Sequence, residues 1–404
     1  MTQTWLSSPL GQEIIELAGT FPDALTGVTK LRLEFPEVSP ELITAAMTQS
    51  RLREKLANRW TIDAQSFLLT QEGLEQASRP LVSEYRANWV TAKFGRPVHV
   101  LDLTCGLGFD ALAFARAGHK VTCYEIDEEV AEMARHNLAG LPVTVITADV
   151  TKIKLPADYD MIFIDPARRD PQAARKSDGS TIRIFDPARW SPSWDFIMGL
   201  TNQKPVLVKV APGIDDDSIK DWDAQWISAD GDLVEAMLSW PGSGKRVATI
   251  LNSQMDTPIQ VEGGSKTPAQ QLGKWLVVPD AALIRAGALT PIAQRINGGL
   301  VNEHIAWLTS DDAKAVDTLV RENLEHSMVF EIVKITTLNE KVLTKALAEF
   351  PASALTIMTR GVTINVEALR RKVFKKKERT SPELILAVYR EDSGPVALIC
   401  RRIC

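Results

Sequence analysis

From residue 97 onward, short runs of aliphatic and β-branched residues alternate with amphipathic stretches, and this alternation restricts the possible folds more than any other feature. The predicted strands are residues 98–103, 120–125, 143–147, 160–164 and 206–210. Residues 110–117 and 127–138, which lie between strands, have helical periodicity. Strands that alternate with helices form parallel sheets buried on both faces. The sequence therefore predicts an α/β domain with a parallel sheet.

An acidic residue closes each of four successive predicted strands: Asp102, Glu125, Asp149 and Asp165, at spacings of 23, 24 and 16 residues. Any one such acid is often only a turn former or a helix cap. Parallel strands end at the same edge of a sheet, so four acids in succession predict a ligand crevice lined by carboxylates. Such a crevice suits a cationic ligand without phosphates, because it would repel a pyrophosphate.

The turn after the first strand reads L-T-C-G-L-G-F-D. Gly106 and Gly108 permit a tight turn and close approach of a ligand, and the next helix starts at the same place. The turn also fits the loose dinucleotide fingerprint, so a nicotinamide dehydrogenase is an alternative. The acid spacing favours S-adenosylmethionine (SAM) instead. Asp102 would lie near its amino group, Glu125 would accept both ribose hydroxyls and Asp149 would bind the adenine amino group.

The segments VLDLTCGLGFD, YEID, TADV and IDPAR resemble the successive motifs of class I SAM-dependent methyltransferases. Together with LTQEGLEQAS, DPARRD and the layout of the C-terminal part, they resemble a bacterial family with a ferredoxin-like insert and a THUMP-like C-terminal domain. The resemblance implies a Rossmann-like sheet and methyl transfer to RNA, since THUMP-type domains accompany RNA-modifying enzymes. The predicted cofactor-binding residues are Asp102, Thr104, Gly106, Gly108, Glu125, Ile126, Asp149 and Val150.

Four parts are predicted along the chain. They are an N-terminal helical region (1–92), the methyltransferase domain (93–252), a small ferredoxin-like domain (270–325) and a basic THUMP-like α+β domain (326–404). Residues 232–240 and 246–251 are separated by Pro-Gly-Ser-Gly and are expected to form an antiparallel hairpin at the end of the catalytic sheet. The last part is expected to run strand–helix–strand–helix–strand–strand.

Asp165-Pro166-Ala167-Arg168 stands where amino-methyltransferases usually carry (D/N)-P-P-(aromatic). In those enzymes the acid or amide side chain and the carbonyl beside the proline accept hydrogen bonds from the target amine. Asp165 and Pro166 are therefore the predicted catalytic residues, acting by positioning and partial charge stabilisation in a direct displacement. The alanine and arginine depart from the family motif and remove the usual stacking aromatic.

Arg168 and Arg169 begin an arginine-rich loop next to this motif and are predicted to contact RNA phosphates. Pairing with the interleaved aspartates of the same loop is the alternative. A uracil-C5 methyltransferase needs a cysteine nucleophile near the base, and no cysteine falls in the later catalytic motifs. Direct methylation of a base nitrogen is therefore the predicted reaction.

The C-terminal part is basic although the whole chain has a formal charge of −5, because residues 330–404 hold 14 Lys/Arg against 8 Asp/Glu. Seven of these cations fall within residues 370–379 beside a single glutamate. The predicted RNA-binding residues there are Arg370, Arg371, Lys375, Lys376 and Lys377. Such binding, to rRNA or tRNA, would weaken with salt. The alternative is a solvated helix face whose cations complement the helix dipole.

The remaining features favour a cytoplasmic enzyme without a membrane partner or a structural metal. The N-terminus lacks the pattern of a signal peptide, and no run approaches the ~18 apolar residues of a membrane span. The four cysteines have no CxxC spacing, and Cys105 and Cys123 are expected to pack rather than react. Two alternatives stay open: methylation of a small molecule or protein, and an RNA-binding protein that retains an idle SAM fold.

Overall fold

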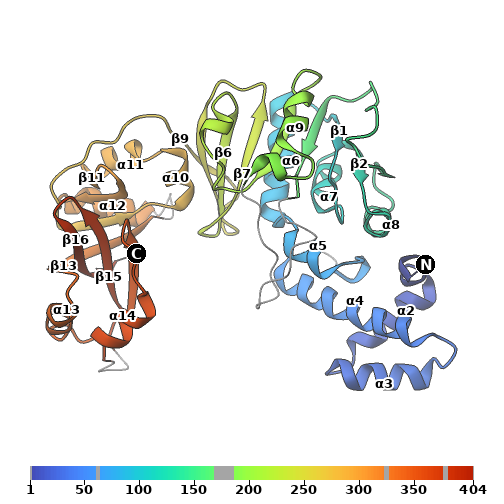
Figure 1. The fold of residues 1–404 in the computed structure, drawn as a ribbon, viewed down its shortest axis with the longest axis horizontal. Helices are drawn as coiled ribbons and strands as arrows, with labels where there is room; N and C mark the ends of the chain where they lie inside the picture. Colours follow the sequence, from blue (N-terminus) through green and yellow to red (C-terminus); the bar gives the residue numbers. More distant parts are fainter. Residues whose placement is uncertain (1, 61–63, 168–185, 323–326, 376–380, 404) are drawn as a thin grey trace. The chain divides into compact units, whose positions relative to one another are not determined.

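The computed structural model of the protein describes residues 2–60, 64–167, 186–322, 327–375 and 381–403 (Figure 1). These residues form two compact units. The first consists of Met1–Asp223 with Met237–Ser243, and the second of Ala224–Ala236 with Gly244–Cys404. None of the helices in the described ranges is long and apolar enough to cross a lipid bilayer.

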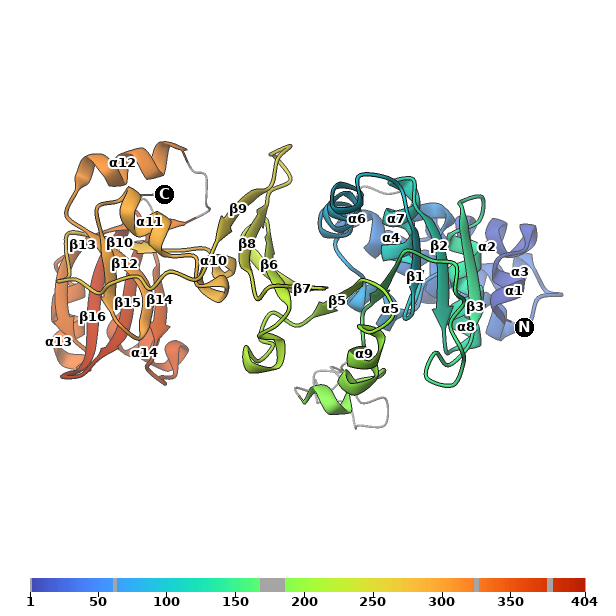
Figure 2. The same ribbon diagram turned by 90° about the horizontal axis from the view of Figure 1, so that it is seen from above.

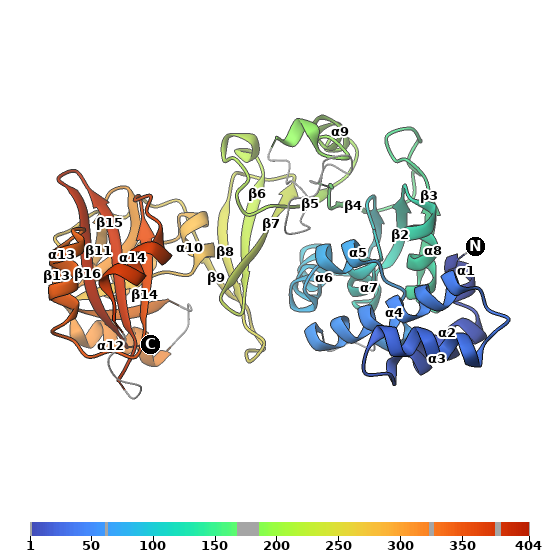
Figure 3. The same ribbon diagram turned by 60° about the horizontal axis from the view of Figure 1, so that its bottom comes forward.

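The first unit begins with a helical region. Its helices are α1 (Thr2–Leu6), α2 (Pro9–Gly19), α3 (Ala24–Glu34), α4 (Pro40–Arg59), the 3-10 turn η1 (Ala64–Ser66), α5 (Gln71–Gln76) and α6 (Pro80–Phe94). Side-chain caps start several of them: Ser39 caps α4 before its first-turn proline, and Thr70 caps α5. Helices α2, α3 and α4 pack together in Figure 3. The predicted helical N-terminal region is thus observed.

A parallel sheet follows and forms the rest of the first unit. Its strands are β1 (His99–Asp102), β2 (Lys120–Glu125), β3 (Val143–Thr147), β4 (Met161–Ile164) and β5 (Val206–Val210). They run parallel in the order β3-β2-β1-β4-β5, and Figure 2 shows β1, β2 and β3 side by side. The helices after these strands are α7 (Phe109–Arg116), α8 (Glu128–Asn137), the 3-10 turn η2 (Pro187–Arg189), α9 (Trp194–Leu200) and the 3-10 turn η3 (Asp217–Ile219). The Rossmann-like prediction is confirmed, because all five predicted strands appear within two residues of their expected ends.

The predicted terminal hairpin is wrong. Strand β7 (Asp232–Trp240) lies between β5 and β6 (Asp223–Ala229), whereas β8 (Arg246–Leu251) runs parallel to β6. The hairpin therefore joins β6 to β7 through Asp230 and Gly231, whose φ angles are 51° and 85°. Two consecutive positive φ values are the requirement of a type I′ turn, which Asp-Gly satisfies well. The resulting order β3-β2-β1-β4-β5-β7-β6 is extended by β8 and β9 (Ile259–Glu262).

The second unit contains a seven-stranded sheet. Its strands are β10 (Trp275–Val278), β11 (Gly299–Asn302), β12 (Ile305–Ser310), β13 (Met328–Thr337), β14 (Leu355–Arg360), β15 (Leu384–Glu391) and β16 (Gly394–Arg402). The order is β11-β12-β10-β13-β16-β15-β14, in which β14 and β15 are parallel and the other neighbours antiparallel. Its helices are α10 (Ala281–Ala286), α11 (Thr290–Arg295), α12 (Ala313–Glu322), α13 (Glu340–Leu347) and α14 (Val366–Val373). Residues 328–402 have the expected order of strands and helices.

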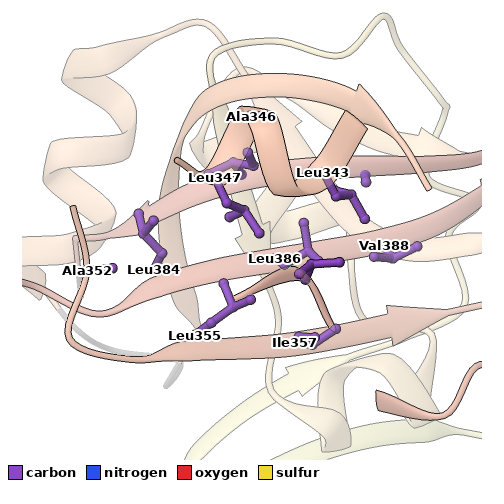
Figure 4. Packing of buried hydrophobic residues seen from close by; sticks show 12 residues of the cluster. Leu343, Ala346, Leu347, Ala352, Leu355, Ile357, Leu384, Leu386 and Val388 are labelled. Atoms are coloured by element: carbon purple, nitrogen blue, oxygen red, sulfur yellow. The ribbon is translucent and has the colours of Figure 1, made fainter. Parts of the chain in front are cut away.

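Helices α13 and α14 cover one face of this sheet. Leu343 and Leu347 of α13 point at Leu384 and Leu386 of β15, as Figure 4 shows. Val373 of α14 is buried in the same cluster, and Val366, Leu369 and Phe374 pack against it. The apolar face of α14 is therefore buried in the core, and only the rest of the helix surface is exposed.

Candidate cofactor and acceptor site

Asp102 ends β1 and is completely buried. Its Oδ1 accepts a hydrogen bond from the backbone N–H of Thr104 at 3.2 Å. Its buried Oδ2 has no hydrogen-bond partner among the described residues. Burial, reinforced by the nearby Asp110 carboxylate, raises the pKa of Asp102 well above its usual range. A buried carboxylate with an unpartnered oxygen is costly, so the structure at this position favours an external cation or hydrogen-bond donor.

Glu125, at the end of β2, is fixed by the glycine turn. Its Oε2 accepts from the backbone N–H of Gly106 and its Oε1 from that of Asp127, each at 3.0 Å. A Cβ placed on Gly106 (φ +53°) would meet nothing within 4 Å, so the backbone there borders open space. Ile126 is 66% exposed and presents an apolar surface beside this carboxylate. The space next to Gly106 is therefore open, and it is close to the Glu125 carboxylate, whose sequence neighbour Ile126 is exposed.

Gly108 of the same turn has a different role. Its φ is +88°, and a Cβ there would lie 2.7 Å from Cδ1 of Leu138. Glycine is therefore required here both by the backbone conformation and by packing against the end of α8. The following helix α7 starts directly at the turn.

Asp149 follows β3 and is held by its own loop. Its Oδ1 accepts from the backbone N–H and the hydroxyl of Thr151, at 3.0 and 2.6 Å, and its Oδ2 pairs with Lys152 at 2.8 Å. The Lys152 partner and the Thr151 hydrogen bonds lower the pKa of Asp149 to about 2. Val150 beside it is buried. Asp149 is therefore a fixed carboxylate whose oxygens already have local donors.

Asp165, which follows β4, is anchored by both its backbone and its side chain. Its N–H donates to the hydroxyl of Thr104 at 2.7 Å, so the acid is attached to the glycine turn. Its Oδ2 lies 2.5 Å from Nζ of Lys209, a residue of β5 that is only 7% exposed. Pro166 is buried, and Ala167 forms an isolated bridge with Ser191. The predicted catalytic acid thus lies beside the predicted cofactor turn.

The sequence motifs did not identify Lys209 as a residue of the site. Its strand reads V-L-V-K-V, and every residue of it is buried. A lysine in a fully buried strand is rarely stable without a partner, which is the signal that could have identified it. Parallel pairing of Ile164 with Val208 places the next residues, Asp165 and Lys209, at the same level of the sheet.

The N-terminal helical region also holds the glycine turn. The side-chain amide of Asn137 donates to the carbonyls of Leu68 and Leu107, both at 3.0 Å, while its oxygen accepts from the N–H of Leu68 at 2.7 Å. Gly73 of α5 leaves room for Leu107, since a Cβ there would lie 2.4 Å from Cδ1 of that leucine. Through Gly73, the LTQEGLEQAS segment packs against Leu107 of the glycine turn, a structural role that the residue spacing did not indicate.

The buried cysteines are consistent with packing roles. The neighbouring Cys123 thiol and burial raise the pKa of Cys105 well above its usual range. No group of three or more His, Cys, Asp or Glu residues suited to a metal ion occurs in the described ranges. The expected absence of a metal stays a prediction.

The described basic residues of α14 are partly paired within the second unit. Arg370 pairs with Glu367 at 3.0 Å, and Nε of Arg371 donates to the Glu367 carbonyl at 3.4 Å. Arg371 and Lys375 are exposed. The other four predicted RNA-binding residues, Arg168, Arg169, Lys376 and Lys377, lie outside the described residues.

The geometry fits a SAM molecule on two observations. Asp102 keeps a buried oxygen without a protein partner, and the space over Gly106 is open beside the exposed Ile126. Glu125 stands at the edge of this space with both oxygens oriented by backbone N–H groups. A cationic, hydroxyl-bearing and partly apolar ligand matches such a donor and acceptor set.

Three domain models match the chain. Residues 100–174 match a methyltransferase domain, residues 328–402 a THUMP domain-like family and residues 2–55 a domain of unknown function, DUF8688. Two curated relatives from Mycobacterium tuberculosis strains CDC 1551 and H37Rv are each named an uncharacterized S-adenosylmethionine-dependent methyltransferase. Each is 29% identical over 387 residues, which cover 93% of this chain and 99% of the relative.

A solved structure has the same fold over almost the whole length. It is the crystal structure of a proposed methyltransferase from Porphyromonas gingivalis W83, with a TM-score of 0.73 and 21% identity. The likeness covers 97% of this chain and 98% of that one. The prediction of a class I methyltransferase domain joined to a THUMP-like C-terminal domain is therefore confirmed.

Proposed function

We propose that this chain is a cytoplasmic, SAM-dependent methyltransferase that transfers a methyl group directly to a base nitrogen of an RNA, either rRNA or tRNA. The methyltransferase domain and its SAM cofactor follow from the matched domain model and the names of both full-length relatives. The observation that supports a catalytic rather than idle fold is the anchored Asp165-Pro166 pair beside the glycine turn.

Asp102, Thr104, Gly106, Gly108, Glu125, Ile126, Asp149 and Val150 would bind the cofactor. The unpartnered oxygen of Asp102 would take the amino group, and Glu125 the ribose hydroxyls. The exposed Ile126 side chain would pack against the adenine ring. Because Asp149 is fixed by Thr151 and Lys152, it would present a preoriented carboxylate to the adenine amino group.

Asp165 and the carbonyl beside Pro166 would accept hydrogen bonds from the target nitrogen and aim its lone pair. SAM supplies an electrophilic methyl group on a cationic sulfur. With SAM held by the turn and the target nitrogen held by Asp165, the methyl group would pass from sulfur to nitrogen as the carbon–sulfur bond gives way to the nitrogen–carbon bond, and the nitrogen would release its proton to water. The protein contributes position and a negative potential where positive charge develops.

The RNA assignment rests on the THUMP-like match and on the basic C-terminal part. Arg168, Arg169, Arg370, Arg371, Lys375, Lys376 and Lys377 are the proposed phosphate contacts. One observation favours the alternative, a small-molecule or protein acceptor: Arg370 pairs with Glu367, and Lys372 with Glu340 at 2.7 Å. These pairs give part of the basic helix a structural role.

The proposal is tested with a labelled methyl donor and total RNA from a strain that lacks the gene. Wild-type protein should label RNA, and Asp165→Ala should lower the rate by at least 10²-fold while it still binds SAM. Equal labelling by both proteins would refute the catalytic assignment. Label that enters protein and not RNA would show that the methyl acceptor is a protein and not an RNA.

A further inference from the structure

Lys209 is a deeply buried cation at the proposed acceptor site. It belongs to β5, is 7% exposed, and its Nζ lies 2.5 Å from Oδ2 of Asp165. Neither the sequence motifs nor the comparisons assign it a role. A charge removed from water to this extent needs a partner, and the ion pair formed with Asp165 supplies one.

The register of the sheet fixes this pair. Strands β4 and β5 are parallel, and Ile164 is the partner of Val208. Asp165, which follows Ile164, is therefore level with Lys209, which follows Val208. The two side chains leave the sheet on the same side. The Asp165 backbone is held separately by the Thr104 hydroxyl at 2.7 Å. Two attachments, one from the turn after β1 and one from β5, thus determine where the carboxylate lies.

We infer that Lys209 is the positioning residue for the acceptor step. Its ammonium group occupies Oδ2 of the Asp165 carboxylate, which leaves Oδ1 to accept the hydrogen bond from the target amine. In the described part of the chain, Oδ1 receives no hydrogen bond from another residue. This inference rests on the proposed function and deepens it.

Without Lys209 the half-buried carboxylate would lose one of its two attachments and would rotate more freely. A rotated carboxylate would no longer lie where the target amine needs its hydrogen-bond acceptor.

The test compares Lys209→Met and Lys209→Arg with Lys204→Met, an exposed lysine shortly before the same strand. At pH 7 Lys209→Met should lower kcat about 10²-fold, because misplacement by about 1 Å costs that much. The Kd for SAM should stay within twofold. Lys209→Arg should recover most of the activity, and Lys204→Met should match wild type.

A loss confined to SAM affinity in Lys209→Met, or a Lys209→Arg variant no more active than Lys209→Met, would overturn the inference while the proposed function stands. If wild-type protein methylates no RNA, the proposed function fails instead. The pair is then judged by the melting temperatures of Lys209→Met, Asp165→Asn and the double variant. A double variant no less stable than either single one supports the positioning contact, and strictly additive losses overturn it. Lys209→Arg supplies the same comparison if Lys209→Met does not fold.

Discussion

Arg86 of helix α6 forms an ion pair with Asp110, the second residue of helix α7, and the arginine side chain is fully buried. Ser78 donates a hydrogen bond to the other oxygen of the same carboxylate at 2.8 Å. Helix α7 begins directly after the glycine turn that borders the proposed cofactor site. The N-terminal helical region is therefore bound, by charge as well as by packing, to the helix that follows the glycine turn.

Replacing Arg86 with methionine should destabilise the protein by about 3 kcal/mol, because it leaves the Asp110 carboxylate, whose side chain is only 12% exposed, without its cation. The free energy of unfolding in urea measures this. Arg116→Met, at the exposed end of the same helix α7, serves as the control and should change stability by less than about 0.5 kcal/mol. A loss below about 1 kcal/mol for Arg86→Met would mean that the pair contributes little.

The two glycines of the turn should respond differently to alanine. Gly108→Ala meets a positive φ and the Leu138 side chain, so it should cost about 2–3 kcal/mol of stability. Gly106→Ala meets only the backbone strain, about 1 kcal/mol, but its methyl group enters the open space of the proposed cofactor site. SAM affinity should fall at least tenfold in Gly106→Ala. Equal stability losses with unchanged affinity would contradict both roles.

SAM binding should release a proton from Asp102. Because burial raises the pKa of this carboxyl, free protein holds the proton to higher pH than an exposed aspartate does. The cofactor's ammonium group favours the ionised form, so affinity should rise with pH up to the folded-state pKa. Calorimetry in buffers of different ionisation enthalpy counts the released protons.

Asp102→Asn is the control for that titration, and it should bind SAM with no proton release at the same pH. The raised pKa of Asp102 also makes stability depend on pH, in the direction opposite to that of SAM affinity. Wild-type protein without ligand should lose stability as the pH rises from the usual aspartate range through the folded-state pKa, because the unfolded chain then releases the proton more readily. Asp102→Asn should lack this slope. Identical pH profiles for the two proteins would rule out Asp102 as the titrating group.

Two exposed cations, Arg371 near the end of α14 and Lys375 just after it, should contribute to RNA affinity through phosphate contacts. The double variant Arg371→Gln/Lys375→Gln should bind RNA more weakly at 100 mM salt, and its log Kd against log salt should be flatter by about one to two units. Lys266→Gln/Lys314→Gln removes the same charge from exposed sites elsewhere in the second unit. If both double variants lose affinity equally, net charge and not this helix determines binding.

The sequence predicted the sheet well because strands buried on both faces form continuous apolar runs. Val206–Val210 and Lys120–Glu125 were located to the residue. The acids at the strand ends followed from the same pattern. The hairpin was misplaced because Pro-Gly-Ser-Gly resembles a turn more obviously than Asp230-Gly231, and because the polar start of β6 hides a strand that is otherwise buried.

The contacts that hold the site depend on partners that are distant along the chain. Lys209 and Asp165 are 44 residues apart, and Arg86 and Asp110 are 24 apart. A buried lysine indicates that a partner exists, but the parallel register of β4 and β5 decides which carboxylate it is. Asn137 gave no sequence signal, because an asparagine at a helix end is common and its two carbonyl partners come from separate segments.

The hydrogen bond between Thr104 and the Asp165 backbone has a kinetic consequence. One threonine touches the loop that would hold the cofactor and also determines the place of the acid that would receive the acceptor. Under the proposed function, movement of the turn around a bound cofactor would be transmitted to Asp165 through this 2.7 Å hydrogen bond. Such a linkage would favour an ordered reaction, in which the acceptor binds productively only after the methyl donor is in place.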